Sequence, residues 1–347
     1  MFEIAARFGV ELSSFSPLGN GHINTTYLVA DTKNDKYVLQ RINNRVFTDI
    51  EGLMNNISLV TRFLNAQKPG SSLNFLTAQD GKAYTEFEGD FYRMYEYVPG
   101  ISLENATRPE DMTTCGKAFG EFQNMLSGFD ASKLSDTIPR FHDSVFRADN
   151  LEKAALEDKL GRLKDVKSEY EFYTSLRDKT DIMLKMQREG LIKTRVTHND
   201  TKLNNVLLDS VTYEPKCVID LDTVMPGLAA NDFGDCIRSG ATSAAEDERD
   251  ISKVHLELNL YRAFARGFLG ACGGALNATE IKTLPLGGLL MTYETGARFL
   301  TDYLSGDVYF KIAYPQHNLV RTRTQIKLIR DTLDNWETLE KIIAEEI

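Results

Sequence analysis

Residues 196–209 read VTHNDTKLNNVLLD, and after a short turn residues 217–223 read CVIDLDT. The first stretch places Asp200 five positions before Asn205, and the second adds Asp220 fifteen residues later. Transfer of a phosphoryl group from a magnesium nucleotide needs a carboxylate that accepts the proton of the attacking hydroxyl, and oxygen ligands that hold the metal. Strand-like apolar runs adjoin both polar segments. The stretch therefore predicts a catalytic loop with Asp200 as the base, and Asn205 and Asp220 as ligands of Mg²⁺.

The H-x-D-x-x-x-x-N pattern of this loop resembles the catalytic loop of the protein-kinase-like superfamily, in its branch of aminoglycoside phosphotransferases and choline kinases. Asn199 stands where that branch commonly has glycine. The chain is more closely similar to bacterial N-acetylhexosamine 1-kinases, in runs that cover most of its length. These runs are GNGHINTTYLV (19–29), RVTHNDTKLNN (195–205), IDLDTVMPG (219–227), DFGDCIRSGA (232–241), RFLTDYLSGDVYF (298–310) and HNLVRTRTQIKL (317–328). The last two are the most specific, because generic members of the superfamily are not expected to share them.

This resemblance implies an α+β, protein-kinase-like fold of two lobes. The small lobe is an antiparallel β-sheet with one helix, and the larger lobe is mostly helical. ATP and Mg²⁺ are the implied cofactors, and the implied reaction phosphorylates the anomeric C1 hydroxyl of N-acetylhexosamines (GlcNAc and GalNAc). Two alternatives stay open. One is a kinase for another small alcohol, such as an aminoglycoside, choline or a different sugar, and the other is a nucleotide-binding regulatory protein without turnover.

The first hundred residues alternate between strand and turn signals. Short runs rich in aromatic and β-branched residues predict five strands: LSSFSPL (12–18), TTYLVA (25–30), KYVLQRI (36–42), AYTEFEG (83–89) and FYRMYEYV (91–98). Apolar residues at helical spacing predict one helix over 51–66. The YVPG segment marks a boundary. We therefore predict a nucleotide-binding lobe over 1–98 and a helical lobe with the catalytic loop, metal site and sugar site over 99–347.

The second lobe reads as mostly helical. Periodic apolar residues predict helices over 112–126, from Tyr170 onward, and over 253–269, 280–304 and 317–345. The acidic run AAEDERD (244–250) is interpreted as the solvated start of a helix rather than a site.

Two segments of the first lobe are candidates for nucleotide binding. Gly19-Asn20-Gly21 suits a plain type I′ hairpin turn, but its backbone N–H groups could also approach phosphates. With the catalytic loop downstream we favour the phosphate-binding reading. The resemblance adds residues 96–98, which are Glu96, Tyr97 and Val98, as the adenine-binding segment.

Gln40 occupies the position where the superfamily commonly has lysine or arginine. An amide can donate hydrogen bonds to a phosphate but brings no charge. Either the metal and the glycine turn compensate the phosphate charge, or Arg41 or Lys36 takes the place of the missing lysine. Gln40 is the one argument for a protein without turnover.

Asp232-Phe233-Gly234 matches the DFG motif that carries the metal ligand in protein kinases. It lies thirty-two residues after Asp200 and follows a helix signal rather than a strand. We therefore keep Asp220 as the metal ligand, with Asp222 as a further candidate. Asp232 is expected to hold the catalytic loop by hydrogen bonds to its backbone, and His198 is expected to be structural as well.

The resemblance implies that His22, Arg298 and Tyr309 contact the sugar together with Asp200. An arginine fork and a phenol suit several hydroxyls and an acetamido carbonyl. The residues alone also fit an arginine in a structural salt bridge and a core tyrosine. Arg321 and Arg323 are expected to be structural.

Composition narrows the class of partner. The net charge of −10 and a pI near 5.2 argue against nucleic acid or an anionic membrane surface. The start MFEIAARFGVEL lacks the basic segment of a signal peptide, and no apolar run is long enough for a membrane span. The four cysteines show no CxxC spacing and read as reduced core residues. We expect a cytoplasmic monomer whose partners are ATP and a small sugar.

Overall fold

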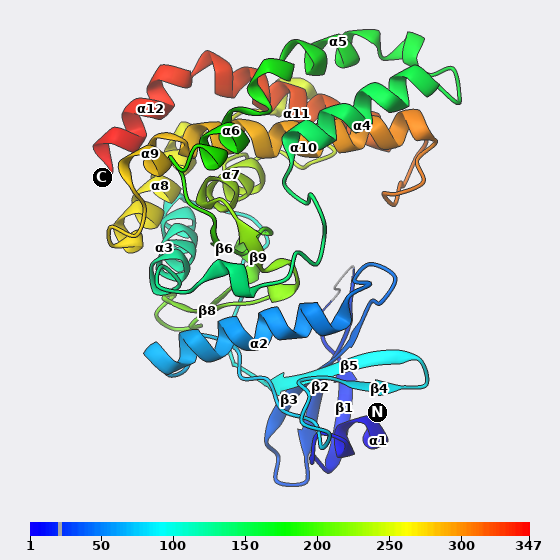
Figure 1. Cartoon of the computed structure of the whole chain (residues 1–347), viewed down its shortest axis with the longest axis vertical. Coiled ribbons are helices and arrows are strands. Elements are labelled where there is room, and N and C mark those ends of the chain that lie inside the picture. The colour runs from blue at the N-terminus through cyan, green and yellow to red at the C-terminus, as the bar shows by residue number, and fades with distance from the viewer. Residues whose placement is uncertain (20–22) are drawn as a thin grey trace. The chain divides into compact units, whose positions relative to one another are not determined.

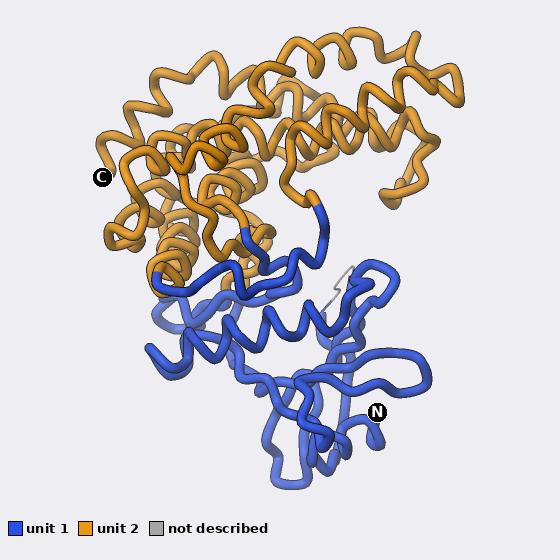
Figure 2. Tube along the Cα trace, in the orientation of Figure 1, with its two compact units in different colours: residues 1–101, 128–139, 207–226 blue, residues 102–127, 140–206, 227–347 orange. Residues whose placement is uncertain are grey.

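The computed structural model describes residues 1–19 and 23–347. They form two compact units (Figure 2). The first unit comprises residues 1–101, 128–139 and 207–226, and the second comprises 102–127, 140–206 and 227–347. The predicted division after residue 98 lies close to the first boundary, but two later segments join the first unit.

Asn56 gives the physical reason why those segments belong to the first unit. It lies on helix α2 (Ile50–Gln67) and is fully buried. Its Nδ2 donates to the carbonyls of Ser135, at 2.8 Å, and Val224, at 3.0 Å. Its Oδ1 accepts from the Ser135 N–H at 2.8 Å. One amide therefore holds both segments against the helix.

The first unit is built on a five-stranded antiparallel sheet in the order β1-β2-β3-β5-β4 (Figure 1). The strands are β1 (Leu12–Pro17), β2 (Thr25–Asp31), β3 (Lys36–Ile42), β4 (Thr85–Phe87) and β5 (Asp90–Glu96). All five were predicted to within a few residues. The short helix α1 (Phe2–Ala6) was not, and it packs with the sheet in one apolar core.

Helix α2 follows the sequence prediction closely. It begins at Asp49, whose side chain accepts from the Gly52 N–H at 2.8 Å and caps the helix. Its apolar residues recur at helical spacing and are buried. Strands β7 (Val206–Leu208) and β8 (Pro215–Val218), which correspond to the strand-like runs beside the two polar segments, pair with one another before Asp220.

The second unit is mostly helical, which confirms the predicted fold class. Its regular elements, with β9 at the unit boundary, are α3 (Pro109–Met125), α4 (Ser144–Glu157), α5 (Lys167–Ser175), α6 (Ile182–Arg188), β6 (Arg195–Thr197), β9 (Met225–Gly227), α7 (Ala229–Gly240), α8 (Leu258–Cys272), α9 (Ala278–Lys282), α10 (Leu284–Ser305), α11 (His317–Asp334) and α12 (Trp336–Glu345). Helix α10 is buried along most of its length and packs against α4, α7 and α11.

Two sequence predictions in this unit were wrong in detail. The helix predicted over 317–345 is two helices, because the chain breaks at Asn335, whose Nδ2 donates to the Asp331 carbonyl at 2.8 Å. The helix predicted over 280–304 is likewise divided, into α9 and α10. Residues 244–250 are exposed or half-buried, and Asp250 caps a short 3₁₀ helix (Ile251–Lys253). Glu246 from that run is exposed and forms an ion pair with Arg238, whose side chain is only 10% exposed.

The four cysteines are buried thiols, as predicted. Cys115 Sγ and Cys236 Sγ approach to 3.6 Å. Within residues 1–19 and 23–347, every helix is too short or too polar to cross a membrane.

Candidate active site

The catalytic loop lies in the second unit between β6 and a short 3₁₀ turn (Leu203–Asn205). Lys202 Nζ lies 2.5 Å from Asp200 Oδ1, and Asn205 Nδ2 donates to Asp200 Oδ2 at 3.1 Å. The same nitrogen donates to the Asp200 carbonyl at 2.8 Å. Both oxygens of the carboxylate are thus bound by groups from its own loop. Since the Asn205 nitrogen is engaged with Asp200, the amide oxygen is the atom it can present to a cation.

The charge state of Asp200 follows from these contacts. Burial alone would raise the pKa of this carboxyl, but Lys202 and Asn205 outweigh burial and hold that pKa below its ordinary value. Asp200 is therefore a carboxylate at neutral pH and can accept a proton.

Asp232 holds the catalytic loop from helix α7, as the sequence predicted. Its Oδ2 accepts from the His198 N–H at 3.0 Å, and its Oδ1 accepts from the Asn199 N–H at 2.8 Å. Thr201 Oγ1 donates to the Asp232 carbonyl at 2.5 Å, and Gln123 Nε2 donates to Asp232 Oδ2 at 2.9 Å. The carboxylate is fully buried, and this burial raises its pKa in spite of the N–H donors.

The rest of the DFG tripeptide has a packing role. Phe233 is fully buried against Tyr261, Phe264 and Phe268 of α8. A Cβ on Gly234 would lie 2.2 Å from the Gly287 carbonyl oxygen, so glycine is what lets α7 approach α10. His198 is also fully buried and lies edge-on to two phenylalanines of α3, in keeping with a structural role.

In the first unit, a buried polar network starts at Gln40 on β3. Gln40 Nε2 donates to Thr26 Oγ1 at 3.0 Å, and Arg93 Nε donates to Gln40 Oε1 at 2.9 Å. Arg93 also forms an ion pair with Asp222. Asp222 in turn accepts from Asn24 Nδ2 at 2.5 Å. The network ties β2, β3 and β5 to the segment that follows β8.

Arg93 is a residue that sequence reasoning missed. Register places it directly opposite Gln40, and its side chain is only 3% exposed. Burial would lower the pKa of Arg93, but Asp222 outweighs burial and raises it. Arg41, one proposed substitute, is half-exposed and paired with Asp90 at 3.2 Å. The available signal was a single arginine inside the apolar run FYRMYEYV.

Asp220 follows β8 in a left-handed conformation, with φ at +59°, and its side chain is exposed. An exposed carboxylate suits a magnesium ion that keeps waters and phosphate oxygens as further ligands. Asp222 pairs with Arg93 and accepts a hydrogen bond from Asn24, so both of its oxygens have partners within this unit. Across the described part of the chain, three or more His, Cys, Asp or Glu side chains nowhere gather as a ready-made metal site.

The predicted nucleotide segments are only partly covered by the structure. Gly19 is exposed with a φ of +68°, whereas Asn20, Gly21 and His22 lie outside the described residues. The N–H groups of Glu96 and Tyr97 donate to the carbonyls of Asn74 and Lys36, both at 3.0 Å. Those two donors are engaged within the unit, so an adenine ring would rely on other backbone groups of residues 96–98.

Arg298 and Tyr309 lie together in the second unit. Arg298 Nη2 lies 3.5 Å from the Tyr309 hydroxyl, and its guanidinium also faces the ring of Phe310 at 5.3 Å. Tyr309 is 71% exposed, which excludes the alternative of a core tyrosine. Arg323 forms the structural ion pair expected of it, with Glu169 at 2.7 Å.

A turn built on Asp302 carries Tyr309. The buried Asp302 carboxylate accepts three backbone N–H groups, from Val308, Tyr309 and Phe310, at 2.8 to 3.0 Å. Asn318 Nδ2 donates to Asp302 Oδ2 at 2.9 Å, which joins the two most specific sequence runs. Gly306, with a φ of +103°, ends α10 so that the turn can begin.

Comparison with known proteins identifies the class of this fold and loop. A model described as the phosphotransferase enzyme family matches residues 14–268. The chain belongs to this family. The predicted superfamily branch is thereby confirmed, and the finer resemblance to N-acetylhexosamine kinases stays a prediction.

Three solved structures illustrate the fold of this phosphotransferase. A microcompartment-associated aminopropanol kinase is similar with a TM-score of 0.64 and 16% identity, over 97% of each chain. An aminoglycoside phosphotransferase from Alicyclobacillus acidocaldarius gives 0.59 and 14%, over 99% of this chain and 96% of that one. An amicoumacin kinase in complex with AMP-PNP, Ca²⁺ and Ami gives 0.59 and 16%, over 90% and 87%. At these identities the likeness establishes the fold.

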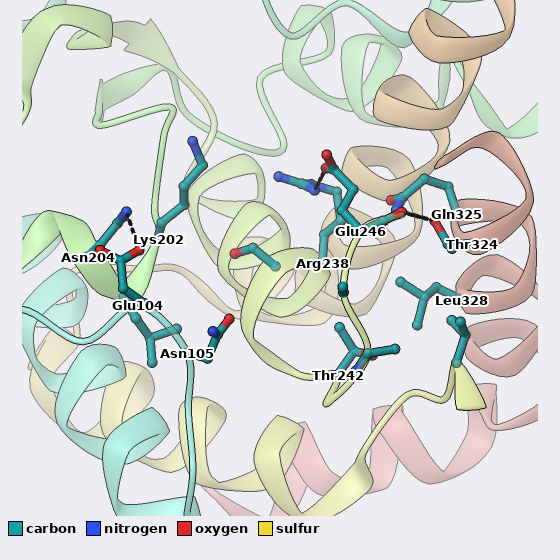
Figure 3. Close-up of a pocket in the computed structure, with 15 residues that line it drawn as sticks. Glu104, Asn105, Lys202, Asn204, Arg238, Thr242, Glu246, Thr324, Gln325 and Leu328 are labelled. Carbon is teal, nitrogen blue, oxygen red and sulfur yellow. Dashed lines mark hydrogen bonds and ion pairs between the residues drawn. The ribbon is translucent and has the colours of Figure 1, made fainter. Parts of the chain in front are cut away.

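The phosphotransferase has a cavity of about 200 Å³ beside its catalytic loop, within the second unit (Figure 3). Its polar lining consists of Glu104, Asn105, Lys202, Asn204, Arg238, Ser239, Thr242, Glu246, Thr324 and Gln325. Figure 3 shows Lys202, Asn204 and Glu104 across the cavity from Gln325 and Thr324. The buried oxygens Asn204 Oδ1 and Gln325 Oε1 have no hydrogen-bond partner among the described residues. Sequence reasoning did not single out this lining.

Proposed function

We propose that this phosphotransferase transfers the γ-phosphoryl group of ATP to the anomeric C1 hydroxyl of N-acetylhexosamines. The observation that carries the proposal is the catalytic loop, in which Asp200 is ionised and held by Lys202 and Asn205. Complexes of similar proteins with AMP-PNP and Ca²⁺, and with ADP and spectinomycin, support a nucleotide and a divalent cation as partners.

In the proposed reaction, Asp200 accepts the proton of the acceptor hydroxyl as that oxygen attacks the γ-phosphorus. The bond from the γ-phosphorus to the bridging oxygen breaks, and ADP leaves. The anomeric hydroxyl is more acidic than an ordinary alcohol, so a carboxylate of low pKa suffices as base. Asn205 and Asp220 would hold Mg²⁺, which neutralises phosphate charge when bound.

The second unit offers the groups that a sugar acceptor needs. Arg298 and Tyr309 are proposed contacts for hydroxyl and acetamido oxygens, and His22 is a further proposed contact. The amides and hydroxyls around the cavity provide the same chemistry, and the two buried oxygens at Asn204 and Gln325 would accept from sugar hydroxyls. The cavity is smaller than the roughly 300–1,000 Å³ typical of drug-sized ligands, which suits a monosaccharide.

An amino alcohol or aminoglycoside is the second candidate acceptor. Similar folds include aminopropanol and aminoglycoside kinases. Glu104 and Glu246 in the cavity lining could hold an ammonium group. Arg298 would disfavour a cationic acceptor, and for that reason we rank the neutral sugar first.

A panel of N-acetylhexosamines, simple sugars, amino alcohols and aminoglycosides, incubated with Mg-ATP and scored by ADP release, tests the choice. The proposal expects turnover with GlcNAc or GalNAc and a non-reducing product whose phosphorus couples to H1. A product that still reduces, or phosphorus coupled to the C6 protons, would contradict C1 transfer. Turnover with amino alcohols alone would select the second candidate.

A further inference from the structure

His142 precedes helix α4 and reaches the catalytic loop of the same unit from far away in sequence. Its Nε2 lies 3.2 Å from the Asn199 carbonyl oxygen. Its Nδ1 lies 3.2 Å from Glu294 Oε2 on α10. The ring is mostly buried and also faces Phe141. Neither sequence reasoning nor the proposed reaction gives this histidine a role.

Both partners of the His142 ring are hydrogen-bond acceptors. A neutral imidazole carries one N–H and can satisfy only one of them, whereas an imidazolium donates to both. Glu294 is itself buried and accepts from Ser144 Oγ at 2.6 Å. The geometry therefore selects the protonated ring.

The charges around the ring act in the same direction. Burial would lower the pKa of His142, but the hydrogen bond and charge of Glu294 outweigh it, and Asp235 on α7 adds to the effect, so the pKa is raised. Arg147 on α4 interacts electrostatically with Glu294. Burial and the charge of Arg298 together lower the pKa of Arg147. The ring thus has one carboxylate and one carbonyl as hydrogen-bond partners, and Asp235 contributes a further negative charge.

The contact with Asn199 bears on the orientation of the base. The peptide group between Asn199 and Asp200 is fixed at both ends, because its carbonyl meets His142 and its N–H lies 3.3 Å from His198 Nδ1. Asn199 has a left-handed backbone, with φ at +62°, a conformation that asparagine adopts more readily than most non-glycine residues. Rotation of this peptide would redirect the Asp200 side chain.

We propose that His142, as an imidazolium bound to Glu294, is a positioning residue that fixes the Asn199–Asp200 peptide and thereby orients the catalytic carboxylate. This role rests on the proposed function in one respect, namely that Asp200 is the base. A positioning role differs from that of a simple ion pair between His142 and α10, because it predicts an effect on turnover that is separate from folding.

His142→Gln is the primary variant, since a carboxamide has a single nitrogen, cannot place a donor at both ring-nitrogen positions and carries no charge. His255→Gln is its matched control. His255 also meets a carbonyl, of Ser252 at 2.7 Å, and a carboxylate, of Asp331 at 3.6 Å, but on the exposed surface. The measurements are kcat and the KM for ATP from about pH 5 to above pH 8, the range in which histidines titrate.

His142→Gln is expected to lower kcat by roughly tenfold to a hundredfold, as expected for a misplaced catalytic group, with the KM for ATP nearly unchanged. The wild-type kcat should fall at alkaline pH as His142 loses its proton, and this limb should vanish in the variant. His255→Gln should behave as wild type. Equal kcat values in the two variants, with the alkaline limb retained in both, would overturn the proposal.

Glu294→Gln keeps the proposal testable if His142→Gln does not fold. Removing the carboxylate should lower the pKa of His142, so the alkaline limb should move to lower pH. A limb that stays in place would contradict the proposal. If wild type phosphorylates no acceptor, the proposed function fails by itself. In that case the test is NMR of the His142 imidazole and the Asp200 carboxyl. The Asp200 signal should shift as His142 titrates. An Asp200 signal that does not respond to the titration of His142 would overturn the proposal.

Discussion

Gln40 on β3 and Arg93 on β5 face one another in register, and the Arg93 Nε–H donates to Gln40 Oε1 over 2.9 Å. A glutamine where the superfamily has a cation therefore lies next to a buried arginine on the adjacent strand. Gln40 was the one sequence argument for a protein without turnover. Arg93 places a cation beside Gln40, but the ion pair with Asp222 compensates its charge. The metal and the backbone of the glycine turn therefore remain the proposed partners of the phosphates.

The buried ion pair between Arg93 and Asp222 is expected to be important for folding. Arg93→Met would leave Asp222 buried without its cation, which should lower the free energy of unfolding by about 3–5 kcal/mol. Arg41→Met removes an exposed ion pair on the neighbouring strand β3 and should lower the free energy of unfolding by less than about 1 kcal/mol. Urea unfolding measures both values. An equal loss of stability in the two variants would contradict the stabilising role of the buried Arg93–Asp222 pair.

Asp200→Asn tests the base. The amide cannot accept the hydroxyl proton, so kcat should fall by roughly 10²–10⁴ while the nucleotide still binds. Steady-state ADP release and nucleotide titration provide the two readings. Asp209→Asn, in the β7–β8 turn, is the control and should keep near wild-type kcat. An Asp200→Asn enzyme with normal turnover would remove this residue from the chemistry.

Substitutions of Asp220 and Asp232 are expected to have different effects on magnesium dependence and on stability. Asp220→Asn should raise the Mg²⁺ concentration needed for half-maximal rate, because it removes charge from the proposed metal site. Asp232→Asn puts an amide where two backbone N–H groups need an oxygen, and should lower the thermal midpoint instead. Magnesium titrations and thermal melts of both variants separate the roles. The reverse pattern would exchange the two assignments.

Arg298→Ala addresses the acceptor site. Loss of a polar contact to the sugar costs about 1–3 kcal/mol, so kcat/KM for the sugar should fall while the KM for ATP stays nearly constant. Arg323→Ala is the matched control, because it removes an arginine whose partner is Glu169. Kinetics with either substrate varied would distinguish them. A change confined to the KM for ATP would place Arg298 elsewhere in the mechanism.

Stability should also depend on pH through His142. Its pKa in the folded protein is raised, so the folded state binds this proton more tightly than the unfolded chain. The resulting stability is fully present below the unfolded pKa of about 6.5 and is lost as pH rises through the folded pKa. Urea midpoints of wild type should therefore fall as the pH rises above about 6.5, and those of His142→Gln should fall less. Parallel pH profiles would argue that the ring is neutral throughout.

The sequence predicted those features that depend on local pattern. Alternating and helical periodicity located the strands and most helices, and the placement of Asp232 after a helix signal correctly predicted its contacts with the loop backbone. Arg93 and His142 were not found, because their importance depends on partners distant in the chain. Arg93 acquires meaning only once β3 and β5 are paired in register. His142, in the run FHDS, has no local pattern at all.

Glu246 shows what a run of charges does not reveal. Its acidic surroundings indicated solvent, and its side chain is 43% exposed, but the fold also brings Arg238 to it and makes it part of a cavity wall. Charge runs report the average environment of a segment, whereas a single ion pair depends on which helix packs nearby.

The turn built on Asp302 has a consequence for the entropy of ligand binding. Three successive backbone N–H groups are already bonded before any acceptor arrives. Ordering a residue costs about 1–2 kcal/mol, and here that cost is incurred once, when the protein folds. An acceptor that meets Tyr309 would find a rigid surface, so discrimination among sugars should follow the fit of their hydroxyls rather than the ease of closing a flexible loop.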